Sequence, residues 1–439
     1  MKTSTSATLD DLVAAARERY AATRPQSDAL HRRAVNVMPG GNTRSVLHFE
    51  PFPFRVVGTD GAMLRDADGH RYVDLLGNYT AGFLGHAPAP VRAAIERVLQ
   101  EGWSIGATQP REVELAELIC ARFASIQQVR FTNSGTEANV YAIAAALHHT
   151  QRRRVLVFEG GYHGGVLSFG HGPSPINVPY QFSIGVYNDI DALDALFAGD
   201  YGQQFGCAVV EPMLGSAGCI PASDGFLQRL RSLCTRHGVV LIFDEVMTSR
   251  LGPGGAQQLV GVTPDMTTLG KYLGGGFSFG AFGGSREIMS VFGGGPHDGV
   301  TLAHAGTFNN NPLSMAAGVA TLRDVLTDQA VREVNTRGDA CREALAGVFA
   351  EAGIPMCVSG RGSMIGVHGC AGPVRTLADV AASDERWKEI YFFAMLERGY
   401  YLAQRGFIAL SLEVTDEMVD GFVNATREWA GEMATIVNG

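Results

Sequence analysis

The sequence predicts an α/β fold in which a mostly parallel sheet is covered by helices on both faces. Short apolar strands alternate with helical segments between residues 79 and 312, a pattern typical of parallel sheets. Some of these strands, such as residues 155–158 and 239–243, are apolar at every position, which indicates that both of their faces are buried. Polar and glycine-rich motifs follow the strands, and ligands of such sheets bind beyond the carboxyl ends of the strands.

The length of 439 residues is too great for one hydrophobic core, so about two domains are expected. Residues 79–312 form the predicted large domain, and residues 1–78 and 313–439 are expected to form a smaller α+β domain. The N-terminal segment reads as helical from about residue 10 to 37, with a break at Pro25, and then as short strands. The C-terminal segment is predicted to contain a helix over 313–349, a strand over 364–368, a helix over 385–398, a strand over 408–412 and a helix over 416–437.

Composition narrows the class of protein. The formal net charge of −9 argues against a nucleic-acid partner, which would favour a basic face. The seven cysteines are scattered without a CxxC pair, so neither a disulfide framework nor a zinc site is expected. The first residues lack the apolar stretch of a signal peptide, and no apolar run is long enough to span a bilayer. We therefore expect a soluble, cytoplasmic protein without a membrane or nucleic-acid partner.

The first motif, NSGTEAN at residues 133–139, lies between a predicted strand and a predicted helix. Backbone N–H groups and the dipole at a helix start favour a phosphate group. Ser134 and Thr136 add hydroxyl donors, and Gly135 permits close approach of the backbone. An ordinary strand-to-helix turn with a Ser or Thr cap has the same pattern, so this motif alone leaves both readings open.

The second motif, VLIFDEV at residues 240–246, places Asp244 and Glu245 at the end of an apolar strand. A carboxylate there can pair with a pyridine nitrogen and keep it protonated, as pyridoxal phosphate chemistry requires. A carboxylate that binds magnesium at a strand end is an equally good reading of this motif alone.

The third motif, TTLGKYLGGG at residues 267–276, surrounds Lys271 with apolar residues and glycine. Desolvation can lower the pKa of such a lysine, which frees the amine to form an imine. The alternative is a surface lysine. A P-loop is excluded because Tyr272 follows the lysine where Ser or Thr is required. In GGYHGG at residues 160–165, Tyr162 is either a stacking group for a ring or a core tyrosine.

Taken in order, these motifs resemble fold-type I pyridoxal-phosphate enzymes, and the chain resembles the class III aminotransferases. The subgroup is the one that contains glutamate-1-semialdehyde aminomutase. The likeness covers nearly the whole chain through NSGTEAN, GGYHGG, VVEPMLG, FDEVMTSR, TTLGKYLGGG and GTFNNNP. Within the family it is greatest to bacterial β-phenylalanine aminotransferases, at residues 39–47, 78–82 and 405–407.

The resemblance implies a large domain with a seven-stranded type of sheet and pyridoxal 5′-phosphate as cofactor. It implies that Lys271 holds the cofactor as a Schiff base and moves the proton, and that Asp244 pairs with the pyridine nitrogen. The phosphate would lie on residues 134–136. Tyr162 and Val246 would lie on the two faces of the ring.

Further roles follow from the same resemblance. Glu211 would support hydrogen bonds beside the ring. Thr307 would reach the phosphate of a neighbouring subunit, which implies a homodimer with shared active sites, unless Thr307 is a loop cap. Arg44 and Arg405 would bind substrate carboxylates, and the alternative is that one of them is a solvated surface arginine. Tyr79 would line the substrate pocket or serve as a core tyrosine.

The function expected is a ping-pong transaminase that moves an amino group from a β-amino acid of the β-phenylalanine kind, aryl or alkyl, to 2-oxoglutarate or pyruvate. Two other enzymes fit the same motifs. One is an aminomutase of the glutamate-1-semialdehyde kind, and the other is an amine transaminase that accepts amines without a carboxylate. A catalytically silent binding protein is a fourth reading, which the complete set of motifs disfavours.

Overall fold

The computed structural model describes residues 8–170, 172–199, 201–293 and 302–438. The chain divides into two compact units. Unit 1 consists of Met1–His86, Thr336–Val374 and Ala378–Gly439, and unit 2 of Ala87–Asn335 and Arg375–Leu377. Residues 1–7 of the predicted N-terminal segment and residue 439 of the predicted C-terminal one lie outside the described residues.

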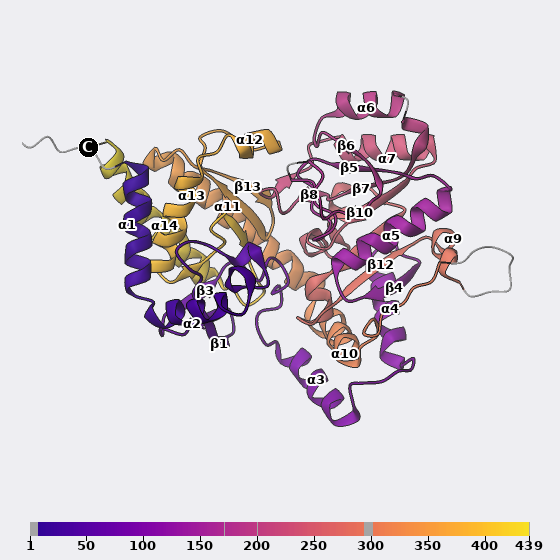
Figure 1. Ribbon diagram of the computed structural model, residues 1–439, viewed down its shortest axis with the longest axis horizontal. Helices are drawn as coiled ribbons and strands as arrows, with labels where there is room; N and C mark the ends of the chain where they lie inside the picture. Colours follow the sequence, from indigo (N-terminus) through magenta and orange to yellow (C-terminus); the bar gives the residue numbers. More distant parts are fainter. Residues whose placement is uncertain (1–7, 171, 200, 294–301, 439) are drawn as a thin grey trace, which may run out of the picture. The chain divides into compact units, whose positions relative to one another are not determined.

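Unit 2 is built on a seven-stranded sheet with the strand order β4-β12-β11-β10-β7-β5-β6 (Figure 1). Only β12 runs antiparallel to its neighbours, β11 and β4. The predicted mostly parallel sheet is therefore confirmed. The strands are β4 (Gln128–Thr132), β5 (Arg154–Phe158), β6 (Gln181–Gly185), β7 (Phe205–Val210), β10 (Val240–Asp244), β11 (Met266–Gly270) and β12 (Gly280–Gly284); a separate hairpin pairs β8 (Met213–Leu214) with β9 (Ile220–Pro221).

Helix α5 (Gly135–Thr150) packs on this sheet through alanines that lie at helical spacing and are fully buried, among them Ala138, Ala142 and Ala146. Small side chains bring the helix axis close to the strands, which places the first turn of α5 beside the strand ends. The other helices of unit 2 are α3 (Ala89–Glu101), α4 (Pro110–Arg122), α6 (Ile190–Ala198), α7 (Phe226–His237), α8 (Gly255–Val260), α9 (Arg286–Met289) and α10 (Pro312–Ala320).

The predicted continuous helix over 313–349 is wrong, because the helix is interrupted. After α10, residues Thr321–Val325 form a π-helical turn, and Leu326 takes non-helical backbone (φ −83°, ψ 59°). Helix α11 (Asp328–Ala352) then starts afresh, because the Thr327 hydroxyl accepts a hydrogen bond from the Ala330 N–H at 3.1 Å. An N-cap of this kind ends one helix and begins another within an apolar pattern that looks continuous.

Unit 1 contains a four-stranded sheet, order β1-β2-β3-β15, and a three-stranded sheet, order β13-β14-β16. Helices α1, α13 and α14 lie side by side in this unit (Figure 1). The elements are α1 (Leu9–Ala22), α2 (Pro25–Val35), β1 (Val56–Asp60), β2 (Met63–Asp66), β3 (Arg71–Asp74), β13 (Cys357–Arg361), β14 (Met364–His368), α12 (Leu377–Ala381), α13 (Glu385–Glu397), β15 (Tyr400–Tyr401), β16 (Phe407–Ala409) and α14 (Asp416–Asn438); α12 begins at the last residue of unit 2.

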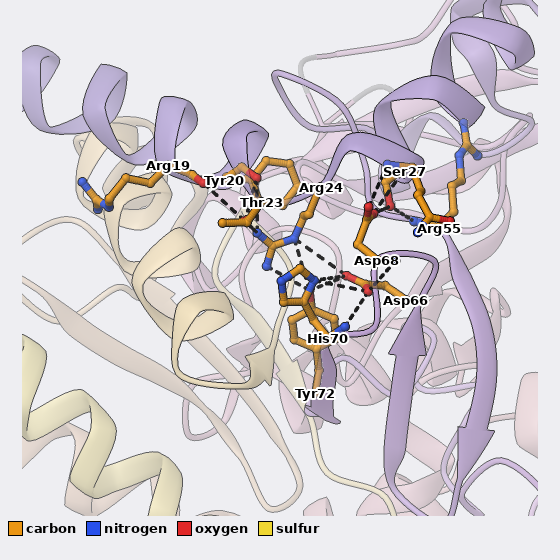
Figure 2. Close-up of polar contacts among 11 residues, drawn as sticks. Arg19, Tyr20, Thr23, Arg24, Ser27, Arg55, Asp66, Asp68, His70 and Tyr72 are labelled. Carbon is orange, nitrogen blue, oxygen red and sulfur yellow. Dashed lines mark hydrogen bonds and ion pairs between the residues drawn. The ribbon is translucent and has the colours of Figure 1, made fainter.

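A buried polar network holds the N-terminal helices to the first sheet (Figure 2). Arg24, only 3% exposed, donates to the Tyr72 hydroxyl at 2.9 Å and lies over the Tyr20 ring, 4.3 Å from its centroid. The Tyr72 hydroxyl donates to the buried Asp66 carboxylate at 2.7 Å, and His70 lies 3.0 Å from the same oxygen. Charged groups with so many partners fix the packing of helix on sheet.

A second set of contacts continues from this network to the loop that precedes Arg44 (Figure 2). Asp68 accepts hydrogen bonds from the Ser27 N–H and hydroxyl, and the Ser27 hydroxyl accepts one from the Arg55 N–H. The Arg55 guanidinium donates to the Gly41 carbonyl at 3.0 Å. The backbone three residues before Arg44 is thus connected through Arg55 to α2 and to the turn after β2.

We expect Arg24→Met to lower the free energy of unfolding of unit 1 by about 3 kcal/mol, because it leaves the buried Asp66 charge without its cation. The measurement is native-state hydrogen exchange of the β2 and β3 amides. The control is Arg32→Met on α2, whose ion pair with Asp28 is exposed and should contribute at most about 0.5 kcal/mol. Equal effects of the two variants would contradict the importance of the buried network.

Candidate active site

Ser134 caps the first turn of α5. Its backbone is extended (φ −155°, ψ 157°), and its side chain accepts the Glu137 N–H at 3.1 Å. A hydroxyl both accepts and donates, so this cap leaves its hydrogen available to a ligand. The cap and the predicted phosphate site are therefore compatible readings of the same residue. The N–H groups of the first helical turn point out of α5 at this end and suit an anion.

Three backbone segments converge on the start of α5. A Cβ placed on Gly135 would lie 2.7 Å from the Val246 side chain, and one on Gly270 would lie 3.3 Å from Val246 and 3.4 Å from the Gly135 nitrogen. The start of the helix, the residues after β10 and the end of β11 thus touch. Residues predicted to hold phosphate, ring and lysine are brought together in unit 2.

Lys271 lies directly after β11 and has a left-handed backbone (φ 57°). This conformation is uncommon for residues other than glycine, asparagine and aspartate, and it recurs at functional sites. With this backbone conformation, the chain turns away from the strand direction at Lys271. Lys271 is partly exposed and follows Gly270, which contacts both Val246 and the phosphate motif.

Tyr162 presents a ring that is 45% exposed, so it is not the core tyrosine of the alternative reading. Glu211, buried after β7, accepts the Tyr162 N–H and the Gly215 N–H, both at 3.0 Å. Glu211 therefore supports the loop of Tyr162. A Cβ on Gly164 would overlap Thr136, so the same loop lies against the phosphate motif.

Asp244 is buried at the end of β10 and accepts three hydrogen bonds. Its Oδ2 lies 2.8 Å from His163 Nδ1 and accepts the Asn139 amide at 2.9 Å, and its Oδ1 accepts the Val246 N–H at 3.0 Å. Asn139 in turn accepts the Thr268 hydroxyl at 2.8 Å. Oδ2 has both lone pairs engaged, whereas Oδ1 keeps one for a further donor.

Sequence reasoning did not identify His163, Asn139 or Thr268 as members of this network. Two signals were present in the sequence. His163 follows Tyr162 in a glycine-rich motif, and Thr268 belongs to the lysine motif, where β11 pairs it with Asp244. Asn139 is the last residue of NSGTEAN, one turn of α5 beyond the phosphate residues.

Charges beside Asp244 shift the pKa values of two buried neighbours, His163 and Glu211. Burial lowers the pKa of His163, but the hydrogen bond to Asp244 and the Asp244 charge outweigh burial, so the pKa of His163 is raised. Burial raises the pKa of Glu211 to about 7, and the charge of His163 counteracts part of this rise. A proton held on His163 is a donor to Asp244, and it compensates the negative charge of the buried carboxylate.

These residues fit pyridoxal phosphate. The start of α5 offers N–H and hydroxyl donors to a phosphate, Tyr162 offers an uncovered aromatic face, and Oδ1 of Asp244 offers an acceptor to a protonated ring nitrogen. The magnesium reading of Asp244 fits less well, because a histidine and two N–H donors already surround the carboxylate. Among the residues that the structure describes, no cluster of three His, Cys, Asp or Glu could hold a metal ion.

The predicted substrate residues lie together in unit 1. The Arg44 guanidinium donates to the Asn78 side chain at 2.7 Å, and the Arg405 guanidinium lies 4.8 Å from the centroid of the Tyr79 ring. The Tyr79 hydroxyl donates to the Val46 carbonyl at 2.9 Å. Tyr79 is thus a buried residue that connects the backbone beside Arg44 with the Arg405 side chain.

The turn that carries Tyr79 is strained. Asn78, Tyr79 and Thr80 all have positive φ (47°, 51° and 74°), and each such residue costs on the order of 1 kcal/mol. A small cavity of about 170 Å³ adjoins this turn, and residues 45–49, Tyr79, Phe392, Tyr401 and residues 403–405 line it. Aromatic side chains and Arg405 line this cavity, and Arg44 directly precedes the lining segment 45–49, so the region suits a carboxylate with an apolar group.

Thr307 lies exposed in a loop that is fixed to the phosphate motif. Asn133, the residue before Ser134, donates to the Asn309 side chain at 2.9 Å, and Asn309 contacts His304. Burial and the nearby Arg130 lower the pKa of His304 to about 4, so His304 is neutral at physiological pH. The cap of the following helix is Asn311, so Thr307 is not the loop cap of the alternative reading.

Comparison with known proteins identifies relatives along nearly the whole chain. The sequence model for "Aminotransferase class-III" matches residues 47–171 and 173–423. The β-phenylalanine transaminase of Variovorax paradoxus is 45% identical over 427 residues, which cover 97% of this chain and 98% of that protein. A glutamate-1-semialdehyde 2,1-aminomutase of Opitutus terrae is 39% identical, covering 89% and 95%.

A solved structure of a β-phenylalanine aminotransferase from Variovorax paradoxus superposes with a TM-score of 0.94 at 45% identity. The superposition covers 98% of this chain and 99% of that one. The predicted fold type and family resemblance are both confirmed. No helix among residues 8–170, 172–199, 201–293 and 302–438 has the length and apolar character needed to cross a membrane.

We expect His163→Phe to weaken binding of pyridoxal phosphate at least about 10-fold, since it removes a hydrogen bond to a charged group. His163→Asn keeps a donor near the position of Nδ1 and should recover most of the affinity. Titration of the apoenzyme with cofactor measures both, and circular dichroism reports folding. His149→Phe, which changes a partly exposed histidine near the end of α5, should bind as the wild type does. Unchanged affinity in His163→Phe would contradict the role of the network.

Proposed function

We propose that this chain, a pyridoxal-phosphate enzyme that belongs to the class III aminotransferase family, transfers the amino group of a β-amino acid to 2-oxoglutarate or pyruvate. The observation that carries the proposal is the pair of arginines, Arg44 and Arg405, beside the aromatic Tyr79. Similarity to the Variovorax β-phenylalanine transaminase supports a donor with an aryl or alkyl group on the carbon that bears the amine.

Bound pyridoxal phosphate would supply an aldehyde carbon that takes the amino group from a donor and gives it to an acceptor, and a ring that withdraws electrons. The chain's own residues do the rest. Ser134, Gly135 and Thr136 bind the phosphate. Asp244 would keep the ring nitrogen protonated, and the Lys271 amine would hold the cofactor and move the proton of the donor carbon. Tyr162 and Val246 would contact the ring.

Two carboxylate-binding arginines suit an enzyme whose two substrates bind in turn. A β-amino acid carries one carboxylate and 2-oxoglutarate carries two, and a planar guanidinium binds a carboxylate through two parallel hydrogen bonds. The Asn78 side chain orients Arg44, and the Tyr79 ring orients Arg405. We propose that one arginine serves the donor and the other the acceptor.

The alternatives make different demands on the same residues. An aminomutase returns the amino group to the molecule that supplied it, so it needs no 2-oxo acid. An amine transaminase needs no carboxylate clamp for its donor. A second arginine, stacked on Tyr79, favours a separate 2-oxo acid acceptor over the aminomutase.

We expect Arg44→Met and Arg405→Met to impair different halves of the reaction. Loss of a bidentate charged contact should raise the KM for the affected substrate roughly 10- to 100-fold and leave the other half-reaction nearly unchanged. The donor half is followed by the change in cofactor absorbance after β-phenylalanine is added alone. The acceptor half is followed with 2-oxoglutarate or pyruvate and the aminated enzyme.

Arg398→Met is the matched control, because Arg398 pairs with Glu432 on the surface of the same unit. It should leave both half-reactions unchanged. Product formed from glutamate-1-semialdehyde without any 2-oxo acid would instead establish the aminomutase. Full donor activity in Arg44→Met and Arg405→Met alike would favour an amine transaminase.

We also infer that the enzyme is a homodimer in which Thr307 binds the cofactor phosphate of the neighbouring subunit. The support comes from unit 2. Thr307 is exposed on an anchored loop, and Phe308 beside it is 63% exposed. The loop lines a cleft of about 760 Å³ together with residues 108–110, Glu112, Val113 and Ala116, and Trp103 is also exposed at 51%. Large exposed apolar side chains are typical of surfaces that bind another protein.

Mixed dimers test this arrangement. Lys271→Ala lacks the lysine, and Thr307→Asp places a negative charge against the phosphate, so each homodimer should be nearly inactive. A heterodimer of the two has one intact site if Thr307 acts across the interface. Co-expression should then restore about a quarter of wild-type activity, from random pairing and one good site per heterodimer. No restoration would show that Thr307 acts within its own subunit or that no dimer forms.

A further inference from the structure

Two cysteines of unit 1 lie in contact. The Sγ atoms of Cys357 and Cys370 are 3.6 Å apart, and both residues are partly exposed thiols. The other cysteines differ from this pair. Cys207, Cys219, Cys234 and Cys341 are buried, and Cys120 is partly exposed.

The backbone brings the two thiols together. Cys357 opens β13 and pairs with His368 across the hairpin, so Cys370 lies two residues beyond its direct partner. Diagonal neighbours of this kind are ordinarily about 7–8 Å apart. Here the chain is held at Gly369, whose carbonyl accepts the Asp384 N–H at 3.0 Å and where a Cβ would overlap the Asp384 carbonyl. The approach of the thiols is therefore a property of the fold.

The two thiols differ in environment. Burial, followed by the hydrogen bond with Cys370, raises the pKa of Cys357 to about 12, so Cys357 stays protonated at physiological pH. The Cys370 Sγ lies 3.6 Å from the Gly372 carbonyl oxygen, and both residues are partly exposed. Because the Cys357 thiol is the one held protonated, we assign the first attack to Cys370 and the second step to Cys357.

We propose that Cys357 and Cys370 form an oxidation site at which a hydroperoxide produces a reversible intramolecular disulfide. The Cys370 sulfur attacks a peroxide oxygen, the O–O bond breaks, and water or an alcohol leaves. The Cys357 sulfur then displaces the hydroxyl from the oxidised Cys370, and a second water leaves as the S–S bond forms. The thiols lose two electrons and two protons, which the peroxide oxygens take up. A dithiol reductant reverses the change.

Little movement is needed to close the bond. A disulfide requires sulfur atoms about 2 Å apart, so the present distance of 3.6 Å must shorten by about 1.5 Å, which side-chain rotation can supply. The disulfide closes the open end of the β13–β14 hairpin. Because β14 also pairs with β16, which begins two residues after Arg405, the site lies one strand away from the proposed substrate arginine.

The test uses the holoenzyme. Hydrogen peroxide is added in increasing amounts, remaining thiols are blocked with N-ethylmaleimide, and proteolytic peptides are identified by mass spectrometry. We expect one cross-linked pair of peptides that joins Cys357 to Cys370, lighter by two hydrogens and absent after dithiothreitol. The pair should form at peroxide concentrations that leave Cys120 available to the blocking reagent.

Three serine variants assign the roles. Cys357→Ser should stop the reaction at oxidised Cys370, with one or more added oxygen atoms, because no resolving thiol is present. Cys370→Ser should leave Cys357 largely unmodified, and Cys120→Ser should behave as the wild type does. Wild-type enzyme alone can overturn the proposal: if Cys357 and Cys370 both remain fully blockable while Cys120 oxidises, the contact is not an oxidation site.

Discussion

The buried Asp244 carboxylate is the constraint on which the rest of the proposed site depends. A charge inside a protein is costly unless donors surround it, and here His163, Asn139 and the Val246 N–H fill that role. Each donor comes from a different element: the loop after β5, helix α5 and the turn after β10. The hydrogen bonds to this one carboxylate therefore fix the loop of Tyr162, the first turns of α5 and Val246, which is expected on the other face of the ring.

Local sequence was sufficient to predict those parts of the site whose residues are neighbours in the sequence. The sheet, its parallel strands and the motifs at strand ends follow from apolar runs and from turn chemistry, and relatives confirm the fold and family. The phosphate cap is similarly local, since Ser134 bonds a residue three positions away. The position of Asp244 at the end of its apolar strand needed only the rule that ligands gather at carboxyl ends.

Contacts between residues that are far apart in the sequence could not be predicted in this way. His163 and Asp244 are separated by 81 positions, and nothing in the pattern states that an imidazole rather than a backbone group meets the carboxylate. The helix after Pro312 was missed for a different reason. Thr327 caps a new helix within a segment whose apolar residues look like those of one continuous helix. The spacing of apolar residues therefore gave no sign of the interruption. The thiol contact depends on a backbone bend at Gly369 that is set by α13.

The groups proposed to hold the cofactor all belong to unit 2, and those proposed to bind substrate carboxylates all belong to unit 1. Substitutions at Arg44, Tyr79 or Arg405 therefore change residues of unit 1 and none of the proposed cofactor residues. An ancestral enzyme of this design can acquire new substrates through changes in unit 1 while purifying selection preserves the cofactor residues of unit 2. Libraries for directed evolution can exploit the same separation, because variation confined to residues 42–47, 78–80 and 401–405 changes none of the proposed cofactor residues.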